Sequence, residues 1–550
     1  MIMITESTRI TSVSWNRIYL TISLEGDLDC LFSIENCETQ ERFPLMMDGG
    51  SIIMNITNVT GIYREEMLGN GSWRIVCHKD GQDFEPVLGI DAAEKLEDLG
   101  KIFPYWHFAY AYAVVFRVHA AVDDTLCLRM DTRYMMRNDR PRKEYIGLEA
   151  SGRKERASRR MGQLVKHVMQ GIYNVAEKTY KGGKNRVLLM SETRAMSGNL
   201  AAIDKRIKEN YPGRVHMSYY FSETLNLPHH KLAFKWLGLM MLMARQDVIV
   251  VDDYSPVFKD IRINHDKTKL VQVWHAGVGF KSVGYARFGK EGSPRALESC
   301  HRHYDYAVVG GTNLIPVYQE VFGINSEKLL PSGVPSIDGF INRIDDLSYR
   351  NEFDEKFPDA AGKKIILFAP TYRGEGQQQA YYPYEKLDFV RIMEYCGDDK
   401  VFLMKMHPFI GRKPELGEDM RKCIIDVSCE DLTELMKISD CMITDYSSVI
   451  YEYCLLDKPI IFYAFDRREY EVTRGFHWDF DEYAPGRICY SFDEVMDSLT
   501  TGECRQDKIE KFREFAFDHT DGHNTDRLIE TLLLRDNDGR GEYDMLKDKE

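Results

Sequence analysis

The segment DCMITDYSSVIYE, which runs from Asp440 to Glu452, contains the clearest fold signal in the second half of the chain. Its apolar start predicts a short buried strand that breaks into a helix start rich in hydroxyl groups. The polar residues at this break are Thr444, Asp445, Ser447 and Ser448. Free N–H groups and hydroxyls at a helix start favour negative charge, so the break predicts a phosphate-binding site. An ordinary Ser/Asp helix cap is the alternative interpretation.

A second apolar run, KPIIFY at 458–463, follows the helix and predicts a neighbouring strand. Strand, helix and strand in this order are typical of a parallel sheet. The phosphate-binding site would then lie at the carboxyl edge of that sheet, where open α/β folds bind their ligands.

The length and composition indicate a globular protein of about three domains. The chain has 550 residues, of which 44% are hydrophobic and 12% aromatic, and its formal net charge is −14. We do not expect such an acidic chain to bind nucleic acid, because clustered Lys and Arg recruit phosphate backbones. One block departs from this balance: between Arg133 and Lys166 there are eleven Lys or Arg and four Asp or Glu.

The cysteines and the apolar segments favour a cytoplasmic protein. The 12 cysteines form no CxxC pair and no Cys/His cluster at zinc spacing, and no apolar signal peptide opens the chain. The most apolar helical run, at 232–243, is shorter than the roughly 20 residues that span a bilayer. We therefore expect a buried helix there.

Residues 1–131 show the alternation of a small antiparallel β-domain. Ile18, Leu20, Ile22 and Leu24 alternate with polar residues, and the turn sequence Gly-Asn-Gly at 69–71 precedes another alternating run. This part of the sequence contains no catalytic constellation, so we expect it to serve in docking or acceptor binding.

Residues 132–182 form a basic linker with helical periodicity. Apolar residues recur at i, i+3 and i+4 spacing between Arg153 and Tyr180. Basic residues crowd the start of this segment: Arg153, Lys154, Arg156, Arg159 and Arg160. An amphipathic helix with a basic end is typical of proteins that lie on an anionic membrane surface. A connecting helix that packs on the next domain is the alternative, and the two interpretations are compatible.

From residue 183 onward the pattern alternates between strands and helices, which predicts βαβ units. The expected strands lie at 186–190, 247–253, 270–274, 306–311, 364–370, 400–408, 441–445 and 458–463. We therefore expect an α/β fold with two Rossmann-like doubly wound domains, 183–345 and 346–550, that face each other across a cleft. The charged residues after Leu534 predict a mobile tail.

Polar residues follow directly after four of these strands, so they lie at the carboxyl edges of the two sheets. They are His275 and Gly277, Thr371 and Arg373, His407, and the turn Tyr446-Ser-Ser448. A neutral imidazole can take a proton from an attacking hydroxyl, and an arginine beside a serine-rich turn can stabilise charge on phosphate. A single histidine at a strand end is usually structural, but one from each domain indicates a shared site.

Two common nucleotide-binding loops are missing from the sequence. There is no GxxxxGK[ST] loop and no GxGxxG loop after a strand, which disfavours an ATPase and a dehydrogenase. The chemistry of the polar residues suits a nucleotide-diphosphate substrate instead.

Six stretches together resemble the CDP-glycerol glycerophosphotransferase family, the teichoic-acid and capsule polymerases of bacteria. They are LVQVWHAG, LFAPTYR, LMKMHP, the block at 440–480, APG at 484–486 and DHTDGHNTDRL at 518–528. The resemblance covers residues 185–535. It implies a two-domain architecture of the GT-B type, with the acceptor on the first Rossmann-like domain and CDP-glycerol held mainly by the second.

The resemblance also implies roles for individual residues. His275 and His407 match the essential histidines of the family: one would be the general base on the acceptor hydroxyl, and the other would hold or protonate phosphate. Which histidine does which stays open. Ser447 and Ser448 would bind the pyrophosphate and Glu452 the ribose hydroxyls. The full donor- and phosphate-binding set is Gly277, Thr371, Arg373, Thr444, Asp445, Ser447, Ser448, Glu452, Arg474, Gly475, Asp521, Gly522 and Arg527.

The acceptor side departs from the family pattern. The family usually continues WHG with Thr-Pro and a Lys-Leu-Gly stretch, whereas this chain has WHAG followed by Val-Gly-Phe. Lys281 and Gly284 keep the pattern. The identity of the acceptor is therefore open.

The resemblance implies transfer of glycerol phosphate from CDP-glycerol to a hydroxyl of a lipid-linked or polymeric acceptor, with release of CMP. Three alternatives stand beside it: a CDP-ribitol-dependent transferase, a GT-B glycosyltransferase that uses a nucleotide sugar such as CMP-sialic acid, and a non-enzymatic scaffold. We expect that no cofactor is required: no acidic cluster calls for a divalent cation, although assistance by one stays open. The expected location is the inner face of the cell membrane, with peripheral attachment to its anionic surface, and the chain could form oligomers.

Overall fold

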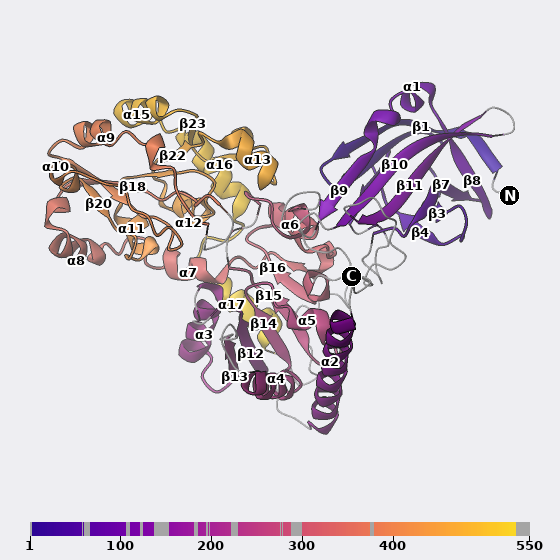
Figure 1. Cartoon of the computed structure of the whole chain (residues 1–550), viewed down its shortest axis with the longest axis horizontal. Coiled ribbons are helices and arrows are strands. Elements are labelled where there is room, and N and C mark those ends of the chain that lie inside the picture. The colour runs from indigo at the N-terminus through magenta and orange to yellow at the C-terminus, as the bar shows by residue number, and fades with distance from the viewer. Residues whose placement is uncertain are drawn as a thin grey trace.

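A computed structural model of the chain describes residues 3–57, 59, 67–105, 110–121, 125–136, 153–180, 185–193, 196, 198–221, 229–275, 277, 279–287, 300–374 and 379–534. These residues form three sheets, one in a β-domain and one in each of two α/β domains (Figure 1). In Figure 1 the β-domain lies at the upper right, the first α/β domain at the bottom and the second at the upper left. The tail predicted after Leu534 lies outside the described residues.

The β-domain is a single 11-stranded sheet that extends to Met136, beyond the expected end at residue 131. Its strands are β1 (Met3–Asn16), β2 (Tyr19–Gly26), β3 (Leu31–Asn36), β4 (Arg42–Leu45), β5 (Met47–Asp48), β6 (Ser51–Asn55), β7 (Gly71–Lys79), β8 (Gln82–Leu88), β9 (Lys101–Tyr105), β10 (Tyr110–Ala120) and β11 (Leu126–Met136). Neighbouring strands run antiparallel except β1 and β8, which pair in parallel. The expected alternation is present, since Ile18, Leu20, Ile22 and Leu24 are all buried. The short helices α1 (Ile90–Ala93) and η1 (Glu97–Leu99) join β8 to β9.

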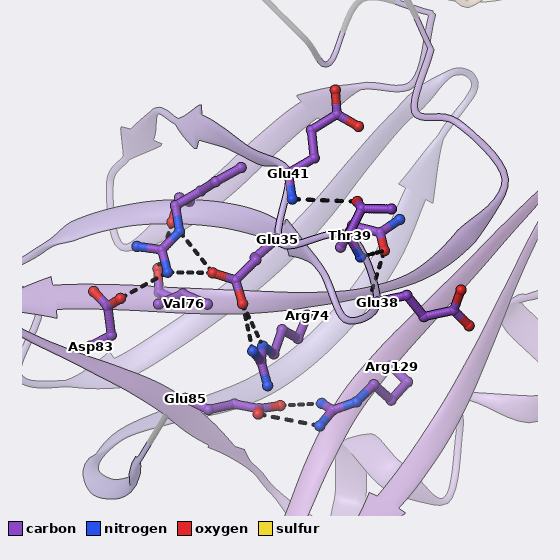
Figure 2. Close-up of polar contacts among 12 residues, drawn as sticks. Glu35, Glu38, Thr39, Glu41, Arg74, Val76, Asp83, Glu85 and Arg129 are labelled. Carbon is purple, nitrogen blue, oxygen red and sulfur yellow. Dashed lines mark hydrogen bonds and ion pairs between the residues drawn. The ribbon is translucent and has the colours of Figure 1, made fainter. Parts of the chain in front are cut away.

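Charged side chains tie neighbouring strands of the β-domain together (Figure 2). Glu35 on β3 accepts hydrogen bonds from the Nε atoms of Arg42, at 2.9 Å, and Arg74, at 3.0 Å. Burial tends to raise the pKa of Glu35, but the hydrogen bonds from Arg74 and Arg42 outweigh it, and the pKa lies below its usual value. Arg42 also pairs with Asp83 on β8 at 2.8 Å. Such pairs between strands stabilise the sheet.

Helix α2 (Arg153–Thr179) leads from the β-domain side to the first α/β domain. Tyr173 and Ala176 are buried against that domain, so the helix does pack as a connector. The same helix exposes Leu164, Val168 and Val175, which are 57%, 52% and 63% exposed. Half of its apolar face is therefore packed and half is open. The basic side chains at 153–160 lie outside the described side chains.

The first α/β domain has a six-stranded parallel sheet in the order β13-β12-β14-β15-β16-β17. Its strands are β12 (Arg186–Ser191), β13 (His216–Phe221), β14 (Val248–Val251), β15 (Lys269–Gln272), β16 (Tyr306–Val308) and β17 (Leu329–Leu330). Its helices are α3 (Gly198–Asn210), α4 (His229–Met243), α5 (Val257–Asp260), η3 (Gly284–Arg287), η4 (Cys300–His303), η5 (Thr312–Leu314), α6 (Ile315–Phe322), η6 (Ser326–Lys328) and α7 (Pro335–Ile341). The apolar run at 232–243 is helical, as predicted, and lies in α4; its residues Leu239, Met240 and Met243 are in the core, whereas Met241 is 38% exposed, so the helix is only partly buried.

The second α/β domain also has a six-stranded parallel sheet, in the order β20-β19-β18-β21-β22-β23. Its strands are β18 (Lys364–Phe368), β19 (Lys400–Met404), β20 (Ile424–Asp426), β21 (Cys441–Thr444), β22 (Ile460–Tyr463) and β23 (Arg487–Cys489). Its helices are α8 (Ser348–Lys356), η7 (Pro358–Ala360), η8 (Tyr384–Lys386), α9 (Phe389–Cys396), α10 (Glu418–Arg421), α11 (Leu432–Ile438), α12 (Ile450–Tyr453), η9 (Cys454–Leu456), α13 (Arg467–Thr473), α14 (Phe480–Tyr483), α15 (Phe492–Thr501) and α16 (Gln506–Ala516). The strand order reverses between β18 and β21, which is the position where such sheets bind ligands.

The end of the described chain returns to the first α/β domain. Helix α17 (Asn524–Leu528) and the π-helical turn η10 (Ile529–Leu533) pack their apolar side chains into the core of the first sheet. Asp338 on α7 accepts hydrogen bonds from the backbone N–H groups of Asn524 and Thr525, at 2.9 and 2.6 Å. The predicted second domain, 346–550, includes this segment, and that part of the prediction is wrong. Its apolar side chains complete the core of a sheet that lies far away in sequence.

Candidate active site

Thr444 and Asp445 tie β21 to β18 at the point where the strand order reverses. The Thr444 hydroxyl donates to the Ala369 carbonyl at 2.7 Å. The buried Asp445 carboxylate accepts the N–H of Thr371 at 2.8 Å and the N–H of Tyr446 at 2.5 Å. Both side chains therefore hold the turn in shape, and neither points a free polar group toward a ligand.

Arg373 is engaged by two carboxylates of its own domain. Its guanidinium donates to Asp445 at 2.9 Å, to both oxygens of Asp466 at 2.5 and 2.9 Å, and to the Thr371 carbonyl at 2.7 Å. Arg373 is 8% exposed and stacks near the ring of Tyr446. Four of its five N–H groups are thus committed to protein atoms, so its contacts indicate that it orders the loops of the site.

The twin serines lie in the short turn between β21 and α12. Ser447 and Ser448 are half-buried, and the Ser448 carbonyl accepts the N–H of Tyr451 at 3.1 Å. Helix α12 has only four residues and continues into η9, so the expected helix is a single turn followed by a 3-10 turn. Its dipole is correspondingly small, and binding of an anion here depends on individual N–H groups and hydroxyls.

A cavity between the two domains brings together His275, Gly277 and Glu452. Asn199 from α3 and Tyr451 also line it. Burial raises the pKa of Glu452 to about 7. A Cβ atom on Gly277 would lie 2.2 Å from the Tyr451 ring, so only glycine permits this close approach of the two domains.

The backbone before His275 adopts an unusual conformation. Trp274 has a φ of 53°, a left-handed value that a bulky residue rarely adopts. Its ring is buried and stacks on the His275 imidazole, with 4.7 Å between the ring centroids. Strained residues of this kind persist where the surrounding packing fixes them, often at functional sites.

The contacts of His275 define its tautomer. Its Nδ1 lies 3.0 Å from the Asp252 carbonyl oxygen, which can only accept, so Nδ1 carries the proton. Its Nε2 then has a free lone pair in the neutral ring. The side chain is 51% exposed, and the Asp253 carboxylate lies 3.8 Å from Nδ1, where it would stabilise an imidazolium.

His407 has the opposite tautomer. Its Nδ1 accepts the N–H of Phe409 at 3.2 Å, so in the neutral ring Nε2 carries the proton and can donate. The imidazole packs against Tyr372, with 4.7 Å between the centroids. Burial lowers the pKa of His407, and the positive charges of Lys281 and Lys405 lower it further.

Lys281 of the first domain reaches into the second. Its backbone forms an antiparallel bridge with Phe476, flanked by hydrogen bonds from Ser282 to Gly475 and from His477 to Phe280, at 3.0 and 3.2 Å. Its ammonium lies 3.4 Å from the Thr371 hydroxyl. Burial lowers the pKa of Lys281 to about 8; Asp445 opposes this effect, and two arginines of the second domain add to it. Lys281 was not among the expected site residues, although its place in the family pattern was a usable signal.

The family follows from the sequence match. The sequence profile of the CDP-glycerol:poly(glycerophosphate) glycerophosphotransferase family matches residues 174–534. The chain belongs to this family. The match leaves out the β-domain and most of α2, so those parts are not accounted for by the family.

The relatives of this chain within the glycerophosphotransferase family include enzymes of teichoic acid synthesis. The teichoic acid ribitol-phosphate polymerase TarK of Staphylococcus aureus is 35% identical over 375 residues, which are 67% of this chain and 72% of TarK. A teichoic acid glycerol-phosphate primase of Bacillus spizizenii is 31% identical over 274 residues, 49% of this chain and 70% of the primase. The solved structure of the wall teichoic acid polymerase TagF has a TM-score of 0.53 at 22% identity, covering 68% of this chain and 94% of TagF, and this likeness concerns the fold.

In this chain, Arg474 lies at a large open cavity of the second α/β domain. The cavity measures about 1050 Å³ and is bordered by Tyr372, Tyr381, Lys386 and Arg468 as well as Arg474. The Arg474 guanidinium donates to the Gly374 carbonyl at 3.1 Å. Gly475 has a φ of 78°, which turns the chain toward the first domain.

Asp521, Gly522 and Arg527 lie where the chain returns to the first domain. Arg527 donates to Asp521, and its second nitrogen donates to Asn524 at 2.9 Å. Gly522 has a φ of 74° and packs against Asn342, where a Cβ atom would lie 2.2 Å from Oδ1. These three residues contact each other and the neighbouring residues of the first α/β domain. None of the described contacts joins them to Ser447 or Ser448.

Two further observations concern metals and membranes. Within the ranges that the structure describes, no group of three or more His, Cys, Asp or Glu side chains is placed to hold a metal ion. The helices of the described residues are all too short or too polar to cross a bilayer.

Proposed function

We propose that this chain transfers an alditol phosphate from a CDP-alditol to a hydroxyl group of a teichoic-acid-type acceptor. The hydroxyl oxygen attacks the phosphorus that carries the alditol, and a new P–O bond forms. The bond from this phosphorus to the bridging oxygen of the diphosphate breaks, and its electron pair leaves with CMP. The opposite tautomers of His275 and His407 carry this proposal, because they supply one proton acceptor and one proton donor.

In this proposal His275 is the general base. Its Nε2 lone pair accepts the proton of the attacking hydroxyl, while Nδ1–H stays bonded to the Asp252 carbonyl. Asp253 would stabilise the imidazolium that forms. The strained backbone at Trp274 and the stacked indole hold the ring in one orientation.

His407 acts on the phosphate. Its lowered pKa keeps the ring neutral at pH 7, and its Nε2–H donates to a phosphate oxygen or to the departing CMP. Lys281, Arg474 and the turn with Ser447 and Ser448 would stabilise the negative charge of the diphosphate. The half-buried Lys281, whose pKa is lowered by burial, gains most from an anion at this place.

The two domains would work as a GT-B-type pair. The second domain would hold the CDP moiety at the reversal between β18 and β21, and the first would present the acceptor hydroxyl to His275. Glu452, which lines the same cavity as His275, would bind a ribose or alditol hydroxyl.

The alditol is glycerol or ribitol. Glycerol phosphate is the expectation from the sequence motifs, and the 35% identity to TarK favours ribitol phosphate. A nucleotide-sugar glycosyltransferase is the remaining alternative. Purified protein should release CMP from one of the CDP-alditols in the presence of a primed acceptor, and not from CMP-sialic acid. Release from the sialic acid donor alone would reject the proposal.

The reaction as proposed uses only side chains for charge stabilisation. Lys281, Arg474 and His407 provide the positive or proton-donating groups, so EDTA should leave CMP release unchanged. Loss of activity in EDTA that returns with Mg²⁺ would show that a divalent cation takes part.

Helix α2 would attach the protein to the inner face of the membrane, where a lipid-linked acceptor lies. The exposed Leu164, Val168 and Val175 form an apolar stripe next to a basic segment of the sequence. The protein should pellet with anionic liposomes more than with neutral ones, and Leu164→Ser/Val168→Ser should reduce pelleting. Equal pelleting on both liposomes would reject the electrostatic part of this attachment.

A further inference from the structure

The tight turn between β1 and β2 reaches from the β-domain onto both α/β domains. At its tip, Arg17 donates a hydrogen bond to the Glu320 carboxylate on α6 of the first domain. The same guanidinium nitrogen lies 3.1 Å from Nε2 of His477, in the second domain. His477 Nε2 in turn lies 3.1 Å from Glu320. One arginine of the β-domain therefore meets one residue from each α/β domain.

Glu320 and His477 are deeply buried, so the Glu320 carboxyl group depends on Arg17 as a hydrogen-bonding and charged partner. They are 1% and 6% exposed. Burial raises the pKa of Glu320 to about 7, and the charge and hydrogen bond of Arg17 oppose this rise. In the described part of the chain, the second oxygen of Glu320 has no hydrogen-bond partner. Removing Arg17 would leave this carboxyl group without its main partner, which is costly in a buried place.

Packed apolar side chains hold the turn at this junction. Ile18 is 1% exposed, and Tyr285 on η3 of the first domain is fully buried within the core of the β-domain. Gly284, with a φ of 52°, lets η3 pack on α6: a Cβ atom there would lie 2.2 Å from the Val321 carbonyl oxygen, one residue from Glu320. The β-domain thus rests on the first domain through a tight interface next to Glu320.

His477 belongs to the segment that crosses between the two α/β domains. Its backbone N–H donates to Phe280, and the preceding Phe476 forms the bridge with Lys281. Three residues before His477, Arg474 borders the large cavity and holds the Gly374 carbonyl. The segment that carries His477 therefore also carries Arg474 and pairs with the backbone of Lys281.

We propose that Arg17 is a positioning residue for the donor site, and that the β-domain uses it to order the segment 474–478 through Glu320 and His477. The β-domain lies outside the family match, and this role would make it contribute to catalysis in the second α/β domain. The proposal rests on the proposed function only in assigning Arg474 and Lys281 to the donor diphosphate. Arg17 itself touches neither.

The test compares Arg17→Met with Arg17→Lys and with the control Arg117→Met. Arg117 pairs with Asp131 on the exposed face of the β-domain and has no contact with the junction. In Arg17→Met, we expect the Kd for CDP and the KM for the CDP-alditol to rise about 10-fold, with a smaller change in kcat. Arg17→Lys should recover much of the affinity, and Arg117→Met should behave as the wild type.

A double variant separates positioning from a general loss of stability. Arg17→Met/Glu320→Gln replaces the buried ionisable carboxyl group that Arg17 partners with a neutral amide, so it should bind CDP more tightly than Arg17→Met alone. Amide hydrogen exchange provides a readout that does not depend on activity. Residues 474–478 should exchange faster in Arg17→Met than in Arg117→Met, while the core strands β18 and β21 exchange as in the wild type.

Unchanged exchange at 474–478 together with unchanged CDP affinity in Arg17→Met would overturn the inference. Faster exchange throughout all three domains would also overturn it, because Arg17 would then serve only global stability. If the wild type does not bind CDP, the proposed function fails, and the exchange comparison still tests the positioning role.

Discussion

Gly277 and Tyr451 meet across the two α/β domains at a distance that leaves no room for a side chain on residue 277. A Cβ atom there would lie 2.2 Å from Cδ2 of the Tyr451 ring. Tyr451 is 3% exposed and directly precedes Glu452. This contact therefore sets how closely His275, two residues before Gly277, approaches the second domain.

Gly277→Ala should lower kcat/KM by about 100-fold, because the methyl group forces the two domains apart at the site. Steady-state kinetics with the CDP-alditol measure this effect. Gly339→Ala on α7 is the matched control, since a Cβ atom there meets nothing within 4 Å. Adding Tyr451→Leu to Gly277→Ala should restore part of the activity. Wild-type kinetics in Gly277→Ala would show that the close approach has no role.

His407→Gln should keep more activity than His407→Asn. The amide nitrogen of glutamine reaches the position of Nε2, the ring nitrogen that donates in the proposed reaction, whereas that of asparagine is nearer the position of Nδ1. We expect kcat to fall about 10-fold in the first variant and about 100-fold or more in the second. A higher rate with asparagine than with glutamine would contradict the tautomer that the Phe409 contact defines.

Lys281→Met should weaken CDP binding by about 10- to 100-fold, because the diphosphate loses a cation that is already partly desolvated. Isothermal titration with CDP measures this change. Lys281→Arg keeps the charge and should retain most of the affinity, and cytidine, which has no phosphate, should bind the wild type and Lys281→Met equally. A matching loss of cytidine binding would mean that Lys281 supports the fold of the site instead.

Glu452 should make the unliganded protein less stable as the pH rises. Its pKa is raised from 4.5 to about 7 in the folded protein, so between these values the folded state holds a proton that the unfolded state has lost. Unfolding then releases a proton, and stability falls with rising pH by at most about 3 kcal/mol. Glu452→Gln should flatten this fall in urea unfolding curves measured from pH 4.5 to 7.5, and the exposed Glu482→Gln should not. Parallel curves for the wild type and Glu452→Gln would contradict the raised pKa.

The sequence was sufficient to predict the α/β fold and the strands that position the site. Apolar runs such as those at 441–443 and 458–463 are short and bounded by polar residues, so their length and their flanking residues identify them as strands. The return of α17 to the first domain was not predictable in this way. Local patterns show that a segment is helical, but they do not show which sheet it covers.

The roles of polar residues at the strand ends were only partly predictable. Arg373 and Asp445 lie at the carboxyl edge, as expected for residues that face phosphate, but Arg373 is paired with Asp445 and with Asp466. A sequence shows which residues lie at an edge, whereas their pairing depends on contacts between distant loops. The contact of Arg17 with Glu320 and His477 joins residues 303 and 460 positions apart and had no signal in the sequence.

The proposed reaction depends most on His275 as the base that activates the acceptor hydroxyl. Its direct test is the single-turnover rate of His275→Asn with a saturating CDP-alditol and a primed acceptor, measured beside the Kd for CDP. If His275 is the base, the rate should be about 100- to 10,000-fold below that of the wild type, with an unchanged Kd. A rate close to the wild type, or a loss of CDP binding that explains the whole decrease, would contradict it.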